Sequence, residues 1–165
     1  MQDAMQPISR RHFIKMGGYT AAAAALPVPR LAWAADRPRE LAFYHLHTGE
    51  KLRLAFYENG RYIPSALAAI GHFLRDWRTG DVHAIDPALL NQLYALQQRV
   101  ETPGAYHVIC GYRSPGTNAM LHAQSEGVAT HSLHLQGRAI DINLPGRNLA
   151  QLHRAALRLN AGGVG

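Results

Sequence analysis

The first 34 residues differ in composition from the rest of the chain, and this limits how much of it can form a packed domain. A basic segment containing Arg10-Arg11 is followed by an apolar, Ala-rich run from Met16 to Leu26 and then by Ala32-Trp33-Ala34. A basic segment, a short apolar segment and a small-x-small cleavage site are the three parts of an export signal. We therefore expect residues 1–34 to be an export signal and residues 35–165 to fold as one domain.

The adjacent arginines also indicate the export route. Arg10-Arg11, with Ser9 before them and Phe13 and Lys15 after them, matches the twin-arginine pattern, which the twin-arginine export machinery reads as a receptor signal. The alternative is a membrane anchor, but the run from Met16 to Leu26 is too short to cross about 30 Å of hydrocarbon. We therefore predict a periplasmic protein that is exported already folded and has no stable membrane anchor.

The charge of the chain says little about its partners. The net charge is +6, but half of this excess comes from the first 34 residues. The remainder has no Lys or Arg run, so we expect no nucleic-acid binding surface. A modest positive charge suits an anionic polymer such as the cell wall without requiring one. We expect a monomer.

The cysteine and histidine content restricts the kind of metal site that is possible. Cys110 is the only cysteine, which excludes an internal disulfide and a Cys-rich zinc site. A metal would therefore have to be held by His and carboxylate side chains, and the chain contains ten His. His45 and His47 alternate on one strand and are expected to face solvent.

Hydrophobic periodicity predicts an α+β domain with a mostly antiparallel sheet flanked by helices. Short apolar runs predict strands over residues 41–46, 52–57, 61–63, 106–110, 133–134 and 137–144. Helical spacing predicts helices from Ser65 to Trp77, from Pro87 to Val100, from Pro115 through His122, and over residues 148–160. Ser65, Asp86 and Ser114 are placed to cap the first three helices.

The segment from Ser132 to Asp141 has the strongest functional pattern. His134 and Asp141 have six residues between them, and Gly137 allows the chain to turn so that both side chains could reach one cation. On a strand, Asp141 would face away from Ile140 and Ile142, and an inward carboxylate needs a partner such as a metal. This spacing alone also arises by chance, so the surrounding sequence has to decide.

The surrounding sequence resembles a known family. The string Ser-x-His-x-x-Gly-x-Ala-x-Asp at 132–141 follows Gly111-Tyr112-Arg113-Ser114-Pro115 and Gly127-Val128-Ala129. Together these segments resemble the zinc peptidases of the D-alanyl-D-alanine carboxypeptidase and VanX/VanY-like clan, and most closely the YcbK-like (MepK-like) murein endopeptidases. The resemblance covers residues 37 to 165 and implies a Hedgehog/D,D-peptidase-like fold.

The resemblance also implies roles for individual residues. His134 and Asp141 would bind Zn²⁺, and Arg113 would lie at the substrate and stabilise the developing oxyanion. Arg113 could instead be a loop arginine in a surface ion pair. Ser132 could orient His134 or be an ordinary turn serine. Asn118 could cap a helix or form a hydrogen bond near the site.

The implied activity is zinc-dependent hydrolysis of peptidoglycan stem-peptide crosslinks during cell-wall remodelling. The family includes enzymes that cut D,D bonds and enzymes that cut L,D bonds, and the sequence does not choose between them. In such enzymes the chain continues after Gly-Gly-Val-Gly to a second His ligand and an acidic base, whereas this chain ends at Gly165. The resemblance therefore implies an incomplete domain with impaired activity, in which His107, His122 or His131 could substitute. The alternative is a non-catalytic peptidoglycan-binding module or a degenerate pseudoenzyme.

Overall fold

A computed structural model describes residues 37–165 except residues 102, 103 and 126, so the predicted export signal lies outside the described residues. The strands are β1 (Arg39–His45), β2 (Lys51–Glu58), β3 (Arg61–Tyr62), β4 (Tyr106–Cys110) and β5 (Asp141–Asn143). The helices are α1 (Pro64–Phe73), α2 (Pro87–Arg99), α3 (Pro115–Gln124) and α4 (Leu149–Leu157), with a 3-10 helix, η1 (Leu133–Gln136). The α+β class is confirmed. Among the described residues, no helix has the length and apolar character needed to span a membrane.

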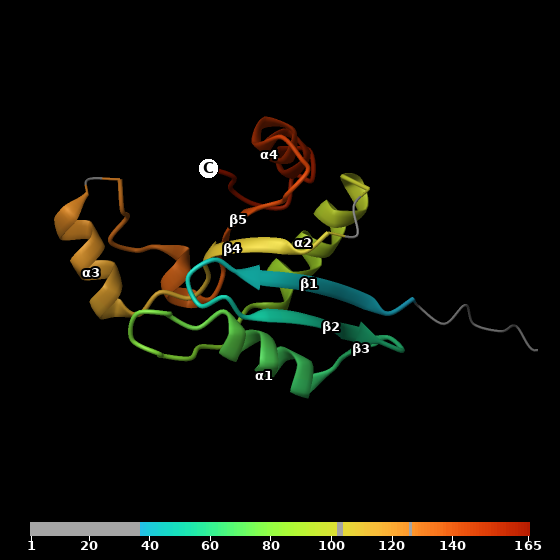
Figure 1. Cartoon of the computed structure of the whole chain (residues 1–165), viewed down its shortest axis with the longest axis horizontal. Helices are drawn as coiled ribbons and strands as arrows, with labels where there is room; N and C mark the ends of the chain where they lie inside the picture. Colours follow the sequence, from blue (N-terminus) through green and yellow to red (C-terminus); the bar gives the residue numbers. More distant parts are fainter. Residues whose placement is uncertain (1–36, 102–103, 126) are drawn as a thin grey trace, which may run out of the picture. The chain divides into compact units, whose positions relative to one another are not determined.

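The five strands form one sheet in the order β3-β2-β1-β4-β5. Three of the pairings are antiparallel, but β1 and β4 are parallel, so the sheet is mixed. A parallel pairing requires a crossover, and α1 and α2 lie between β1 and β4 in the chain. Figure 1 shows the carboxyl ends of β1 and β4 at the same end of the sheet, with α3 beyond them.

The hydrophobic core lies between the sheet and the helices α1 and α2. Leu41 and Phe43 of β1 and Phe56 of β2 are fully or almost fully buried, as their alternation on the strands requires. Asp86 caps α2 by accepting a hydrogen bond from the backbone N–H of Ala88 (2.8 Å), as predicted. The predicted stripe of α2 is buried at Leu89, Leu90, Leu93 and Leu96.

His45 is a correction to the expected solvent-facing strand histidine, because its side chain is fully buried. It follows Leu41 and Phe43 at two-residue spacing, and therefore shares their inward face. Its Nδ1 atom accepts hydrogen bonds from the backbone N–H groups of His47 (3.2 Å) and Thr48 (3.4 Å). The tight turn after β1 thus provides donors to Nδ1, whereas the buried Nε2 has no hydrogen-bond partner among the described residues.

The first helix is shorter than its apolar periodicity predicts. It ends at Phe73 rather than near Trp77, and Ile63 rather than Ser65 is the N-cap residue, because Pro64 takes the first helical position. Beyond the helix, the Asp76 carboxylate accepts a hydrogen bond from the backbone N–H of Arg78 (3.0 Å). Such a local bond competes with helical bonding, so the chain turns although Leu74 remains buried.

The two strands predicted around Gly137 are also corrected. Residues 133–136 form η1, and the following strand is limited to β5, whereas residues 137–144 were expected to be extended. Ser132 caps η1, and Gly137 ends it in the left-handed conformation (φ 63°). A Cβ atom at Gly137 would lie 2.2 Å from the Ala84 carbonyl oxygen, so this close turn requires glycine.

Candidate active site

The site is built where the chain leaves β4 and η1 packs against it. The His134 imidazole, only 9 % exposed, donates a hydrogen bond from Nδ1 to the Gly111 carbonyl oxygen (2.7 Å). In return, the backbone N–H of Arg113 donates to the His134 carbonyl oxygen (3.2 Å). These two bonds fix the ring, and because Nδ1 carries the donated proton, Nε2 is left as the free ligand atom.

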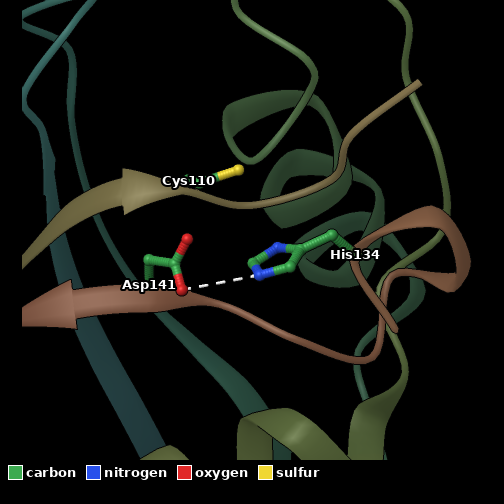
Figure 2. Close-up of side chains that lie close together, drawn as sticks. All are labelled: Cys110, His134 and Asp141. Atoms are coloured by element: carbon green, nitrogen blue, oxygen red, sulfur yellow. Dashed lines mark ion pairs between the residues drawn. The ribbon is translucent and has the colours of Figure 1, made fainter. Parts of the chain in front are cut away.

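Asp141 brings a carboxylate to the same place from the first residue of β5. Its Oδ1 atom lies 3.5 Å from Nε2 of His134, and Figure 2 shows the carboxylate and the ring facing each other. The Asp141 side chain is 49 % exposed, so it lies at the edge of the sheet instead of facing inward as its strand position suggested. The structure therefore brings the predicted pair together at an accessible surface.

Cys110 adds a third donor atom that the sequence analysis missed. In the register of β4 and β5 it is the partner of Asp141, and its side chain is almost buried. Among the described residues, Cys110, His134 and Asp141 form the one group of three potential metal ligands, with donor atoms all within 4.8 Å of one another. Neither His107, His122 nor His131 belongs to this group.

His134 and Asp141 each shift the pKa of the other. Burial alone would lower the pKa of His134, but hydrogen bonding to Asp141, Cys110 and the Gly111 carbonyl raises it above its usual value. The hydrogen bond from His134 lowers the pKa of Asp141, against the effect of burial, and the charge of Arg113 lowers it further. Nε2 and the carboxylate thus face each other across a position that a cation could occupy.

Arg113 lies beside this pair, and its proposed role in catalysis stays a prediction. Its Nη1 atom donates to the Asn118 side-chain oxygen (3.3 Å), and Nη2 lies 3.8 Å from the Cys110 sulfur. Among the described residues, its buried Nε–H has no hydrogen-bond partner. A buried donor without a partner is uncommon in a native protein, and His45 Nε2 and Trp77 Nε1 share this feature among the described residues.

Comparison with known proteins assigns this chain to a family. The family model described as "Peptidoglycan L,D-endopeptidase MepK" matches residues 33–165. The chain belongs to the MepK family. It is 42% identical over 158 residues to peptidoglycan L,D-endopeptidase MepK of Escherichia coli K12, covering 95% of this chain and 87% of that protein.

Other relatives agree with this assignment to the MepK family. The MepK protein of Shigella flexneri is 42% identical over the same share of both chains. A probable peptidoglycan L,D-endopeptidase MepK of Haemophilus influenzae is 38% identical over 159 residues, covering 95% of this chain and 86% of that protein. No solved structure matches significantly.

A second family model, the twin-arginine translocation pathway signal sequence, matches residues 7–27. The predicted twin-arginine signal is therefore confirmed, and with it export across the cytoplasmic membrane to the periplasm.

Ser132 and Asn118, which were also predicted at the site, form hydrogen bonds with the segments that carry His134 and Arg113. Ser132 accepts a hydrogen bond from the backbone N–H of His134 (3.3 Å), which orients η1 but does not touch the imidazole. Asn118 is buried, and its amide donates to the carbonyl oxygens of Ala129 (3.2 Å) and Thr130 (3.4 Å). Asn118 thus joins Arg113 to the loop before η1.

An apolar groove of about 340 Å³ adjoins the candidate site. Asp141 lies on its wall, between Ile140 and Ile142. The other walls come from α2, α4 and the final residues 161–165. Of the candidate-site residues, Asp141 lines the groove, whereas Cys110, Arg113 and His134 do not.

Proposed function

We propose that this protein is a zinc-dependent endopeptidase that hydrolyses L,D peptide bonds in peptidoglycan crosslinks. The observation that carries the proposal is the approach of His134 Nε2 and Asp141 Oδ1 to 3.5 Å beside the Arg113 guanidinium. Its family relatives in Escherichia coli and Shigella flexneri are named as peptidoglycan L,D-endopeptidases. Residues 1–34 act as the export signal in this proposal, and residues 35–165 form the peptidase domain.

The residues present fit a zinc ion. Zinc–nitrogen and zinc–oxygen bonds of about 2.0–2.1 Å in a tetrahedral site place two ligand atoms about 3.3 Å apart. The separation of His134 Nε2 and Asp141 Oδ1 is close to this value. Cys110 supplies a third donor atom in the same group, and a mixed set of nitrogen, oxygen and sulfur donors is typical of zinc.

The side chains around the ion have distinct tasks. When bound, zinc acts as a Lewis acid that polarises a carbonyl and lowers the pKa of water. The Gly111 carbonyl holds the His134 ring in the tautomer that leaves Nε2 free to bind a cation. The Arg113 guanidinium carries several N–H donors in a planar group, which suits the oxygen on which negative charge develops.

The groove beside Asp141 supports a peptide substrate. A crosslink can be cut only if its scissile bond reaches the His134–Asp141 pair, and Asp141 is one of the residues that line the groove. Its lining is mostly apolar, with large side chains such as Leu93 and Ile142 beside small residues such as Ala156 and Gly163. An apolar lining of this kind favours a ligand segment with small apolar side chains, such as the alanines of a stem peptide.

The direct test uses protein purified from the periplasm after export. We expect it to convert muropeptide dimers joined by an L,D bond into monomers, and to leave dimers joined by a D,D bond intact. A chelator should stop the reaction and added zinc should restore it. His134→Ala is the matched control and should be inactive under all conditions.

The same experiment separates the enzyme from the wall-binding alternative. Protein that binds one zinc ion and retains both kinds of dimer without cleaving them would contradict the proposal and would support a non-catalytic module. Cleavage of D,D dimers alone would retain the peptidase and overturn the proposed bond specificity.

A further inference from the structure

A buried carboxylate outside the proposed metal-binding group connects two loops near the site. Asp76 follows α1 and is 1 % exposed. Its Oδ2 atom accepts hydrogen bonds from the backbone N–H of Ser114 (2.9 Å) and from the Ser114 hydroxyl (2.7 Å). Its Oδ1 atom accepts from the backbone N–H of Arg78 (3.0 Å). One side chain thus binds both its own turn and the residue that directly follows Arg113.

The same stretch of chain contacts the exit of β4 at two more points. The Leu74 carbonyl oxygen accepts a hydrogen bond from the backbone N–H of Tyr112 (2.8 Å). Gly111 packs directly on Leu74, since a Cβ atom added at Gly111 would lie 2.6 Å from that oxygen. Residues 74–76 therefore hold the segment 111–114 from one side, while His134 holds it from the other.

We propose that Asp76 is a positioning residue for the reaction, which sets the placement of both the Gly111 carbonyl and the Arg113 guanidinium. The inference rests on the proposed function, because these two groups orient His134 and contact the substrate there. Asp76 touches neither the metal-binding group nor the groove. It acts by fixing the four-residue segment that carries both groups.

A carboxylate is suited to this position because all its partners are donors. Burial raises the pKa of Asp76, but hydrogen bonds from Thr117 and from the side chain and backbone of Ser114 outweigh burial and hold the pKa at about 2. The group is therefore an anion throughout the pH range of the periplasm. An amide in its place would direct an NH₂ group at one of these donors, so Asp76→Asn changes little volume but breaks at least one bond.

A purely structural role in starting α3 would leave the orientation of the His134 ring unaffected. Ser114 caps α3 by accepting a hydrogen bond from the backbone N–H of Thr117 (3.3 Å), and this bond does not involve Asp76. The positioning role instead predicts effects at His134. Its imidazole receives its orientation from Gly111, which lies three residues before Ser114.

The test compares Asp76→Asn with Phe56→Leu in protein exported to the periplasm. Phe56 is fully buried in β2, two strands away from β4, so Phe56→Leu lowers stability without contacting the site. The turnover of L,D-linked dimers is measured with its kcat and KM. Imidazole ¹⁵N chemical shifts of His134, which report its hydrogen bond to Gly111, are measured without substrate.

We expect Asp76→Asn to lower kcat by about 10- to 100-fold with KM almost unchanged, as for other residues that orient a ligand. The His134 shifts should move in Asp76→Asn and remain at wild-type values in Phe56→Leu. Ser114→Ala removes one of the two bonds to Oδ2 together with the α3 cap, and the His134 shifts should move in the same direction to a smaller degree. This second variant decides the matter if Asp76→Asn does not fold.

Two results are distinguishable from a failure of the proposed function. If wild-type protein cleaves dimers but both site variants keep the wild-type kcat and His134 shifts, the positioning role is overturned. If wild-type protein does not cleave dimers while the His134 shifts still move in Asp76→Asn, the proposed function is wrong and the mechanical link from Asp76 to His134 stands.

Discussion

Two regions of the domain are held together by different forces. One region is formed by β1, β2, α1 and α2, and the other is the segment from Gly111 to Asp141. In the first, apolar side chains such as Phe43, Phe56 and Leu90 are removed from water almost completely. In the second, short irregular pieces are joined by bonds between side chains and backbone, as between His134 and Gly111 or Ser114 and Asp76. Burial is not directional, whereas hydrogen bonds fix distances and angles.

Because of this difference, substitutions in the two regions should have different effects on stability and on function. Substitutions in the apolar half should lower the free energy of unfolding and leave the chemistry of the remaining folded protein intact. Substitutions among the polar contacts should change metal binding or turnover by a larger factor than they change stability.

The largest effect is expected from His134→Ala. Removal of the only imidazole in the metal-binding group should lower activity by at least about 1,000-fold and abolish stoichiometric zinc binding, because one of the few ligands is lost. Metal analysis and dimer turnover measure the two outcomes. Retention of one tightly bound zinc ion by this variant would contradict the proposed site, since the ion would then be bound elsewhere.

Phe56→Ala should produce the opposite pattern. Truncation of this fully buried ring should lower the free energy of unfolding by about 3–5 kcal/mol, through lost burial and a cavity. Urea unfolding measures the loss. The kcat of the folded fraction, measured below the onset of unfolding, should stay within about twofold of wild type. A parallel collapse of kcat would show that the two regions are not separable.

Arg113→Lys keeps the charge but removes the planar group of donors. We expect kcat to fall by about 100-fold, the scale of losing one donor to a developing oxyanion, while the midpoint of thermal unfolding changes little. A variant with normal kcat and weaker thermal stability would place Arg113 among the structural residues, with the surface ion pair as its role.

The low pKa of Asp76 leads to a prediction about stability in acid. Its pKa is lowered to about 2 in the folded protein, so it contributes stability that is present above the usual pKa of 3.8 and lost as pH falls through about 2. The shift corresponds to about 2 kcal/mol. The free energy of unfolding of wild type should therefore exceed that of Asp76→Asn at pH 6, and the difference should shrink towards pH 2. A difference that is independent of pH would contradict the ionised anchor.

The smallest effect is expected from Cys110→Ser. The serine hydroxyl is a poorer zinc donor than a thiolate, while His134 and Asp141 remain, so zinc affinity should fall by about 10-fold. Competition with a chelating dye measures the affinity. Cobalt-loaded wild type should also show sulfur-to-cobalt charge-transfer absorption that the variant lacks. Identical affinity and identical spectra would remove Cys110 from the ligand set.

Much of the fold could be predicted from the sequence because local patterns determine it. Strand alternation located β1, β2 and β4, capping residues located α2 and α3, and helical spacing located α4. The errors occurred where distant contacts override local preference. Helix α1 stops early because the Asp76 turn bonds to Ser114, and η1 replaces a strand because Ser132 caps it and Gly137 packs against Ala84.

The candidate site was predictable only in part. His134, Asp141 and Arg113 belong to motifs that can be read along the chain, and the structure brings them together. Cys110 and Asp76 belong to no motif, because their importance depends on partners far away in sequence. Cys110 reaches the site through the register of β4 with β5, and Asp76 through its bonds with Ser114. Parallel pairing of β1 with β4 was missed for the same reason.

Anomalous diffraction at the zinc absorption edge, on crystals of the exported protein, tests the central claim most directly. We predict one strong peak about 2.0–2.2 Å from both His134 Nε2 and an Asp141 carboxylate oxygen, on the side that faces Arg113. A peak bound to other side chains, or no peak at full zinc occupancy in solution, would contradict the account.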